Sequence, residues 1–307
     1  MVDLSVKIGS LTFKNPLLTA SGTFGYGTEF MNFHDVNLYG GIVTKSLTLE
    51  PRGGNKTPRI VETNCGMLNS IGLANVGWNT FLHQILPTLQ KVTTPIIVNI
   101  AGKTREEYVD IARQLSPVSK IKAIEVNISC PNVKQGGMAF GTDPDITQKV
   151  VQGIRQVYEK TIIVKLSPNV TDIGKIAQAA VKAGADALSF INTVLGMRID
   201  IHTKQPMLGN IVGGLSGPAI KPIALAKVFQ VAQAVDVPLI GIGGITCWED
   251  VIEFLIAGAS AVEIGSWNFV DPSGPQIILE GIKNYCQKYS INKISELTNT
   301  LELDNNV

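Results

Sequence analysis

The sequence predicts an α/β fold, a (β/α)8 TIM barrel, and two observations support this prediction. Eight apolar runs of strand length recur along the chain, and amphipathic stretches of helical length lie between many of them. Such alternation is typical of parallel strands joined by crossover helices. The chain has 307 residues, of which 45% are hydrophobic. We therefore expect residues 1–307 to form one barrel domain, with a short polar tail at about 301–307.

Each predicted strand is a short apolar run, and nearly all of them end in polar or glycine residues. In chain order the runs are LLTA (17–20), GIVT (41–44), IIVNI (96–100), AIEVN (123–127), IIVKL (162–166), ALSFI (187–191), PLIGIGG (238–244) and AVEIG (261–265). The carboxyl ends of barrel strands meet on one face, and active sites of such barrels form there. We expect the polar strand ends to build a site on that face.

The predicted helices are the amphipathic stretches between these runs. They cover residues 105–115, 146–159, 173–183, 220–234 and 248–257. No linker or fixed-period repeat interrupts the chain before about Tyr289.

Composition excludes several classes of function. A net charge of +1 gives no electrostatic reason to expect a nucleic-acid partner. The sequence contains no run of about 18 apolar residues and no hydrophobic signal core, so we expect a cytoplasmic protein. The cysteines form no CxxC pair, which argues against a zinc or iron–sulfur site, and Cys65, Cys247 and Cys286 are expected to be ordinary core or surface residues.

Two nucleotide-binding motifs are also missing. Gly102-Lys103-Thr104 resembles part of a P-loop, but Ile97 stands where that motif requires glycine. No G-x-G-x-x-G opens a helix after the first strand, so a dinucleotide in a Rossmann crevice is not expected.

The segment AIEVNISCPN (123–132) is the most informative part of the chain. A thiol, Cys130, stands among Asn127, Ser129 and Asn132 directly after an apolar run. This arrangement suits a planar polar ligand held beside a reactive sulfur. The alternative is a strand leaving the core, with Asn and Ser acting only as turn residues.

The last two strands end in glycines that suit a phosphate. Gly243, Gly244, Gly265 and Ser266 stand where barrels often bind this anion with loop N–H groups, as in FMN or a phosphorylated substrate. Plain tight turns are the alternative, because glycine tolerates positive φ.

Lys165 is a charged residue in the otherwise apolar run IIVKL, so it requires an anionic partner. That partner is either a reduced flavin or an ion pair with Glu125 or another acid.

Several longer motifs occur together and in order along nearly the whole chain. They are ASGTFGYG (20–27), TKS (44–46), GMLNSIGLAN (66–75), NISCPN (127–132), VKLSPN (164–169), NT (192–193), GGLSGPAIKP (213–222), GIGGI (241–245) and GSW (265–267). Through these motifs the chain resembles the catalytic FMN subunit of class 1 dihydroorotate dehydrogenases. The resemblance implies a TIM barrel that binds FMN at the carboxyl ends of its strands.

The resemblance also implies roles for individual residues. FMN is assigned to Ser21, Lys45, Ser46, Asn99, Asn127, Lys165, Ile191, Gly217, Gly243, Gly244, Gly265 and Ser266. The pyrimidine substrate is assigned to Lys45, Asn69, Ser70, Ile71, Gly72, Leu73, Asn127, Asn132, Asn192 and Thr193. Asparagines suit the ring amides of dihydroorotate, and Lys45 suits its carboxylate. Cys130 is expected to remove the C5 proton while the C6 hydride goes to flavin N5.

Three motifs resemble the NAD-linked type 1B subclass more than the fumarate-using type 1A homodimers. They are NVKQGGMAFGTDP (132–144), GMRIDI (196–201) and GGLSGPAIKPIAL (213–225). Type 1B implies a homodimer of this chain within a heterotetramer, whose second subunit carries FAD and a [2Fe-2S] cluster. The alternatives are a type 1A enzyme and a non-redox lyase or isomerase that grips a substrate phosphate.

The glycine-bearing stretch at 133–142 is either a lid over the substrate or an ordinary surface loop.

Overall fold

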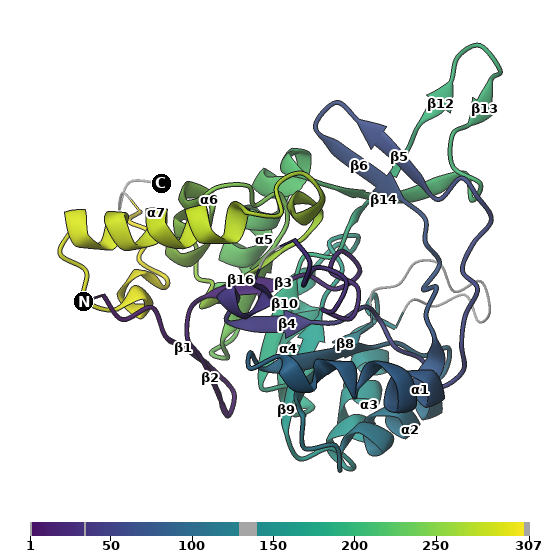
Figure 1. The fold of residues 1–307 in the computed structure, drawn as a ribbon, viewed down its shortest axis with the longest axis horizontal. Helices are drawn as coiled ribbons and strands as arrows, with labels where there is room; N and C mark the ends of the chain where they lie inside the picture. Colours follow the sequence, from purple (N-terminus) through teal and green to yellow (C-terminus); the bar gives the residue numbers. More distant parts are fainter. Residues whose placement is uncertain (1, 34, 129–139, 304–307) are drawn as a thin grey trace.

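A closed barrel of eight parallel strands forms the centre of the molecule (Figure 1). The computed structural model describes residues 2–33, 35–128 and 140–303. The barrel strands are β3 (Leu17–Thr19), β4 (Gly41–Val43), β7 (Ile96–Ile100), β8 (Ile121–Asn127), β9 (Thr161–Lys165), β10 (Ala187–Phe190), β15 (Leu239–Ile242) and β16 (Ala261–Ile264). Strand β16 pairs with β3, with Val262 opposite Leu17, and this pairing closes the barrel. The predicted TIM barrel is confirmed.

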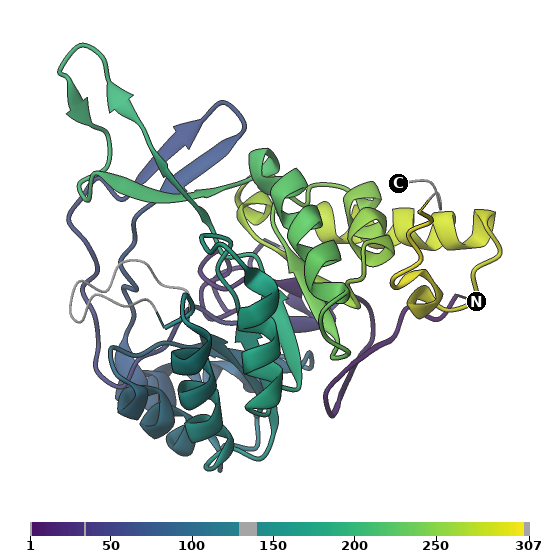
Figure 2. The same cartoon turned by 180° about the vertical axis from the view of Figure 1, so that it is seen from behind.

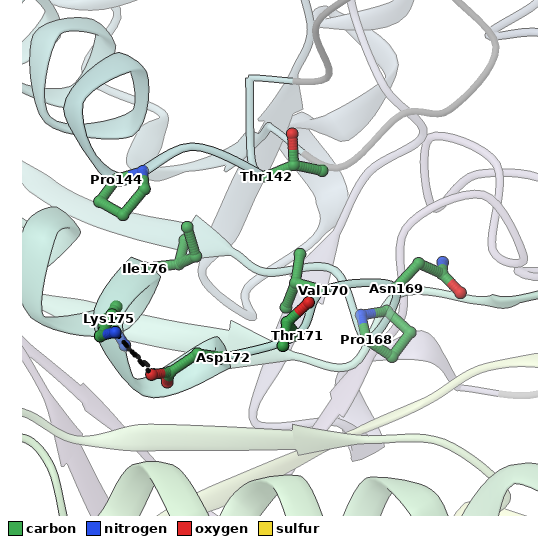
Figure 3. Close-up of a pocket in the computed structure, with 9 residues that line it drawn as sticks. All are labelled: Thr142, Pro144, Pro168, Asn169, Val170, Thr171, Asp172, Lys175 and Ile176. Atoms are coloured by element: carbon green, nitrogen blue, oxygen red, sulfur yellow. Dashed lines mark hydrogen bonds and ion pairs between the residues drawn. The ribbon is translucent and has the colours of Figure 1, made fainter.

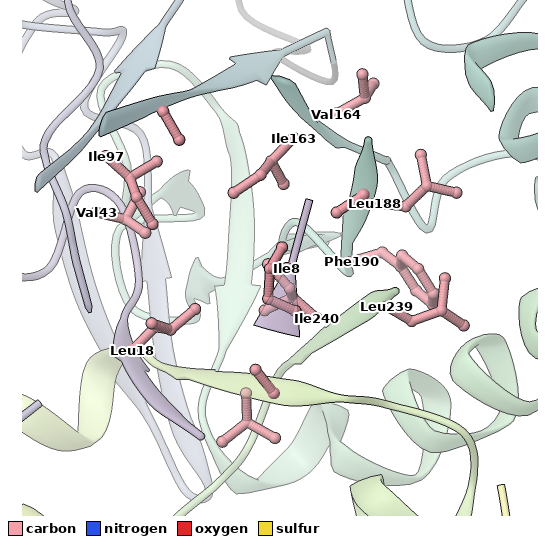
Figure 4. Close-up of a cluster of buried hydrophobic side chains, with 14 of the residues drawn as sticks. Ile8, Leu18, Val43, Ile97, Ile163, Val164, Leu188, Phe190, Leu239 and Ile240 are labelled. Atoms are coloured by element: carbon pink, nitrogen blue, oxygen red, sulfur yellow. The ribbon is translucent and has the colours of Figure 1, made fainter. Parts of the chain in front are cut away.

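The barrel strands are continuous apolar runs because both of their faces are buried. Ile97, Ile163, Leu188 and Ile240 are each fully buried in the cluster drawn in Figure 4. The predicted strands agree with the observed ones to within two residues at each end.

The longer helices of the described chain lie around the barrel (Figures 1 and 2). They are α2 (Arg105–Leu115), α3 (Pro144–Arg155), α4 (Ile173–Lys182), α5 (Lys221–Ala232), α6 (Trp248–Ile256) and α7 (Gly274–Lys288). The second of these was predicted at 146–159, and that prediction was wrong by two residues at the start and by four at the end. Asp143 caps the helix by accepting a hydrogen bond from Ile146 N at 2.9 Å, and Pro144 occupies the first turn.

Short helices fill the remaining connections. They are η1 (Val36–Leu38), α1 (Gly77–Thr80), η2 (Phe81–Ile85), η3 (Thr88–Lys91), η4 (Pro218–Ile220), η5 (Ser266–Phe269) and η6 (Ile294–Leu297). The crossover from β3 to β4 therefore carries only η1 among its described residues.

A second sheet projects from the barrel, and we call it the arm (Figure 1). The arm consists of β5 (Ile60–Thr63), β6 (Gly66–Asn69), β11 (Val194–Met197) and β14 (Val212–Ser216), with the ribbon β12 (Ile199–Asp200) and β13 (Gln205–Pro206). Its strands come from the connections that follow β4 and β10, so it stands at the carboxyl end of the barrel. The arm and its turns expose the apolar side chains of Ile60, Leu195, Met197, Ile199, Ile201 and Ile211.

A hairpin of β1 (Val6–Ile8) and β2 (Leu11–Phe13) packs at the opposite end of the barrel. Its Ile8 is fully buried, and the Ser10 and Thr161 hydroxyls hydrogen-bond at 2.9 Å. The two ends of the chain then meet, because Asp3 N donates to Asn292 O and Ile294 N donates to Asp3 O, both at 2.9 Å. Of the predicted tail at 301–307, residues 304–307 lie outside the described residues.

A search of the described part of the chain for a helix long and apolar enough to cross a membrane finds none.

Candidate active site

The predicted cofactor residues gather at the carboxyl ends of the barrel strands. Asn99, Asn127 and Lys165 lie within the last two residues of β7, β8 and β9. Ser21, Lys45, Ser46, Ile191, Gly243, Gly265 and Ser266 each follow a barrel strand by one to three residues. Because the strands are parallel, these positions share one face of the barrel.

A buried charged cluster occupies the barrel interior beneath this face. Lys165 Nζ lies 3.5 Å from Glu125 Oε1 and 3.2 Å from Glu263 Oε2, and both glutamates are fully buried. This confirms the alternative interpretation of Lys165 as an ion-pair partner of Glu125 or another acid. The same ammonium also donates to Ser21 Oγ at 3.1 Å, so it connects the cluster to a predicted cofactor residue.

The glutamates of this cluster have opposite shifts in pKa. Burial raises the pKa of Glu125, but Lys165 and hydrogen bonds from Glu263, Ser189 and Asn99 outweigh burial and lower it below its ordinary value. Burial and the charge on Glu125 together hold the pKa of Glu263 well above its ordinary value. Burial lowers the pKa of Lys165, but the two glutamates raise it more strongly, so this side chain stays an ammonium.

Two of the predicted asparagines, Asn127 and Asn192, are joined in a hydrogen-bonded network. Asn127 Nδ2 lies 3.5 Å from Ser46 Oγ, and Asn192 Nδ2 donates to Asn127 Oδ1 at 3.3 Å. Tyr108, from α2, donates its hydroxyl to the Asn127 carbonyl at 2.7 Å. Asn192 Oδ1 accepts from Thr193 N at 2.8 Å. These contacts fix the orientation of amide groups that can pair with a planar polar ring.

The arm brings Asn69, at the start of the predicted substrate loop, and Thr193 to either side of Gly214 in β14. Asn69 Nδ2 donates to Gly214 O at 3.3 Å. A Cβ on Gly214 would lie 1.9 Å from Thr193 Oγ1, so these two segments are in close contact. The loop itself is held by Asn55, whose N–H donates to Ile71 O at 3.1 Å.

The predicted phosphate turn has a rigid support. Gly243 and Gly244 have φ of 130° and 72°, values that strongly favour glycine, so the turn alternative still accounts for them without a ligand. Asp250 Oδ2 accepts from Thr246 N at 2.7 Å, and Asp250 Oδ1 accepts from Lys221 Nζ at 2.6 Å. This carboxylate joins the turn to both α5 and α6.

One buried hydrogen-bond acceptor at the carboxyl ends of the strands, Asn99 Oδ1, has no donor among the described residues. Asn99 Nδ2 donates to Glu125 Oε1 at 2.5 Å, whereas Asn99 Oδ1 is buried and accepts no hydrogen bond from the described residues. Buried acceptors without a donor are costly, so this oxygen suits a ligand that presents an N–H group. The flavin ring has such a group.

Part of the predicted site lies outside the described residues. These positions are the predicted base Cys130, the substrate residue Asn132, and residues 133–139 of the predicted lid. Of the other cysteines, Cys65 is exposed and Cys286 is buried. Burial raises the pKa of the Cys247 thiol to about 11, which keeps it protonated near neutral pH.

Sequence reasoning missed Glu263, Ser189 and Asp250. Glu263 had a usable signal, because it is a charged residue inside the apolar run AVEIG, as Lys165 is in IIVKL. Ser189 donates to Glu125 Oε2 at 2.7 Å, but a serine in a strand has no comparable signal.

One cavity among the described residues is lined by none of the predicted site residues. It has a volume of about 570 Å³ and is lined by Thr142, Pro144, Pro168, Asn169, Val170, Thr171, Asp172, Lys175 and Ile176 (Figure 3). Its charged groups, Asp172 and Lys175, form an exposed ion pair at 3.6 Å at the start of α4. The cavity therefore lacks the buried, converging polar groups found at the strand ends.

Comparisons with known proteins identify relatives along nearly the whole chain. The family model of dihydroorotate dehydrogenase matches residues 3–285. A protein of Geotalea daltonii named dihydroorotate dehydrogenase B (NAD(+)), catalytic subunit, is 54% identical over 98% of this chain and 99% of its own length. A protein of the same name from Bacteroides thetaiotaomicron is 52% identical over 99% of this chain and all of its own length.

A solved structure supports the fold alone. The crystal structure of the Eimeria tenella DHODH in complex with ferulenol aligns with a TM-score of 0.82 at 22% identity. The alignment covers 97% of this chain and 88% of that one.

Proposed function

The chain belongs to the dihydroorotate dehydrogenase family, and from that premise we propose that it oxidises (S)-dihydroorotate to orotate in pyrimidine synthesis. The observation that carries the proposal is its identity of 54% with a catalytic subunit of that name over 98% of the chain. The buried ammonium and ordered asparagines at the strand ends are the chemistry that such a substrate and a flavin require.

FMN is the proposed cofactor, and the site residues fit it. Asn99 Oδ1 offers a buried acceptor to the ring, Lys165 provides a fixed positive charge, and the glycine turn at Gly243 and Gly244 suits the phosphate. Ser21, Ser46, Ile191, Gly217, Gly265 and Ser266 complete the proposed contacts. When bound, FMN supplies a hydride acceptor at N5.

The substrate is proposed to lie among the asparagines. Asn69, Asn127, Asn132 and Asn192 would pair with the ring amides, together with Thr193 and the loop at 70–73. Lys45 would neutralise the carboxylate. Cys130 would take the C5 proton as the C6 hydride leaves. The substrate thereby loses one proton and one hydride, and a C5–C6 double bond forms. A thiol base should work better as pH rises, since its ordinary pKa is about 8.5.

Electrons are proposed to pass to NAD⁺ through a partner subunit. The relatives' printed name, with its "B (NAD(+))" and "catalytic subunit", supports this assignment. Following the family resemblance, the partner would carry FAD and a [2Fe-2S] cluster, and two copies of this chain would form the centre of a heterotetramer. The apolar side chains exposed on the arm are a surface suited to such assembly.

The anaerobic visible spectrum of the purified chain, before and after addition of L-dihydroorotate, tests the proposal. A yellow protein that bleaches supports both cofactor and substrate. A yellow protein that stays oxidised contradicts the substrate, and a colourless one that rejects added FMN contradicts the flavin and favours the lyase or isomerase. NAD⁺ reduction by the chain co-purified with its partner then separates the type B assignment from the fumarate-linked alternative.

A further inference from the structure

Glu263 is a buried acid that the proposed reaction does not use. It comes from β16 and reaches across the barrel interior to Lys165 of β9, 3.2 Å away. Glu125 of β8 contacts the same ammonium at 3.5 Å. Two carboxyl groups and one ammonium are therefore enclosed together, and full ionisation would leave one uncompensated negative charge in the core.

One oxygen of Glu263 indicates that this carboxyl group carries a proton. Glu263 Oε1 is buried and accepts no hydrogen bond from the residues that the structure describes. The Glu263 carboxyl group is close enough to that of Glu125 to interact with it, and a carboxylate cannot donate to another carboxylate. A proton on Glu263 would allow a hydrogen bond to Glu125. It would also reduce the cluster to one positive and one negative charge.

No other charged group of the described chain competes for this proton. The neighbouring strands β3 and β15 have no ionisable side chain. On α6, which packs on β16 from outside the barrel, Asp250 and Glu253 pair with Lys221 at 2.6 and 2.9 Å, and Glu249 lies on the same helix. The charged groups that act on Glu263 are Glu125 and Lys165. Burial and the charge on Glu125 raise its pKa, which agrees with a retained proton.

We propose that Glu263 is a positioning residue which shares one proton with Glu125, and that loss of this proton at high pH lowers the reduction potential of the cofactor above Lys165. With Glu263 protonated, the ammonium is paired with a single carboxylate and the cluster carries no net charge. Ionisation of Glu263 would give the cluster a net negative charge, which opposes the arrival of electrons at the site. The second part rests on the proposed function, because it requires FMN at this site.

The shared proton can be tested on the FMN-free protein, where the proposed function plays no part. Infrared spectroscopy at neutral pH, with H/D exchange, detects the carbonyl stretch of a protonated carboxylic acid. We expect this band in the wild type and its loss in both Glu263→Gln and Glu125→Gln, since either variant leaves one carboxyl facing one ammonium. Glu280→Gln, an exposed change of the same kind on α7, should keep the band.

Three results would overturn the shared proton: no band in the wild type, a band that survives in Glu263→Gln, or one that survives in Glu125→Gln. Should one variant fail to fold, the wild type and the other variant still decide the question.

The redox part is tested by measuring the FMN reduction potential against pH. We expect the wild-type potential to fall below that of Glu263→Gln as pH rises, with an inflection that the variant lacks. Superimposable curves would overturn the coupling while leaving the infrared result intact. Failure of the chain to bind FMN would instead contradict the proposed function, and it would overturn the redox part with it.

Discussion

Replacing Lys165 with methionine tests how strongly the buried cluster contributes to folding. The ammonium is 4% exposed and its partner Glu125 is fully buried, so water screens neither group. Methionine keeps most of the volume but leaves the Glu125 carboxylate without a cation. Breaking a buried pair in this way costs about 3–5 kcal/mol, and the absence of solvent exposure favours the upper half of that range. The assay is urea unfolding of the FMN-free protein.

The pH dependence of this loss has a definite sign. In the wild type the pKa of Glu125 is depressed, so its stabilisation is present above the ordinary carboxyl pKa and is lost as pH falls. Without Lys165 the largest influence that lowers the pKa of Glu125 is gone, and only the hydrogen bonds from Glu263, Ser189 and Asn99 oppose burial. The pKa of Glu125 therefore rises, and stability is lost as pH rises. The difference between the proteins should therefore grow from pH 5 to pH 8, by at most about 1.4 kcal/mol per unit for one proton.

Two controls bracket this prediction. Lys175→Met removes an ammonium that is 72% exposed and should change the free energy of unfolding by less than about 0.5 kcal/mol. The double variant Lys165→Met with Glu125→Gln should recover much of the loss, because the one carboxyl group left in the cluster, Glu263, is kept protonated by burial and so carries no unpaired charge. A loss below about 1 kcal/mol in Lys165→Met, or the same loss at both pH values, would refute the reasoning.

Three further predictions concern the supports of the site. Asp250→Ala removes the acceptor of the Thr246 N–H, so we expect the free energy of unfolding in urea to fall by about 2–3 kcal/mol. FMN binding, measured by fluorescence titration, should also weaken. An unchanged FMN affinity would contradict a role for Asp250 in supporting the phosphate turn. Tyr108→Phe removes the hydrogen bond to the Asn127 carbonyl and should cost about 1–2 kcal/mol and raise the KM for dihydroorotate; a rise in stability would contradict it. Cys130→Ala should slow flavin reduction in stopped flow while FMN stays bound, and full-speed reduction would remove Cys130 from the mechanism.

The barrel could be predicted from the sequence because local pattern determines it. Strands buried on both faces must be apolar, and runs such as IIVNI and IIVKL mark them directly. The arm could not be predicted in this way. Its strands are two to five residues long and partly exposed, so they carry no strong periodic signal. Their order in the sheet depends on pairings between segments about 145 residues apart, such as Gly214 with Asn69.

The candidate site could likewise be predicted from the sequence only in part. Lys165 and Asn127 stand out locally, as polar residues at the ends of apolar strands. The partnership of Lys165 with Glu263 depends on closure of the barrel, because β9 and β16 are not neighbours in the sheet and the two residues are 98 positions apart. The open acceptor of Asn99 likewise becomes visible only when its other contacts are known.

The joining of β16 to β3, and of Asp3 to the segment at 292–294, has a consequence for synthesis on the ribosome. The first barrel strand has no partner on one edge until the last strand, β16, has been made. At about 5–20 residues per second, this edge stays open for roughly 12–50 s of translation. An unpaired strand edge invites association with other chains. During that interval the short length of β3, which is three residues, limits how much unpaired strand edge the nascent protein exposes.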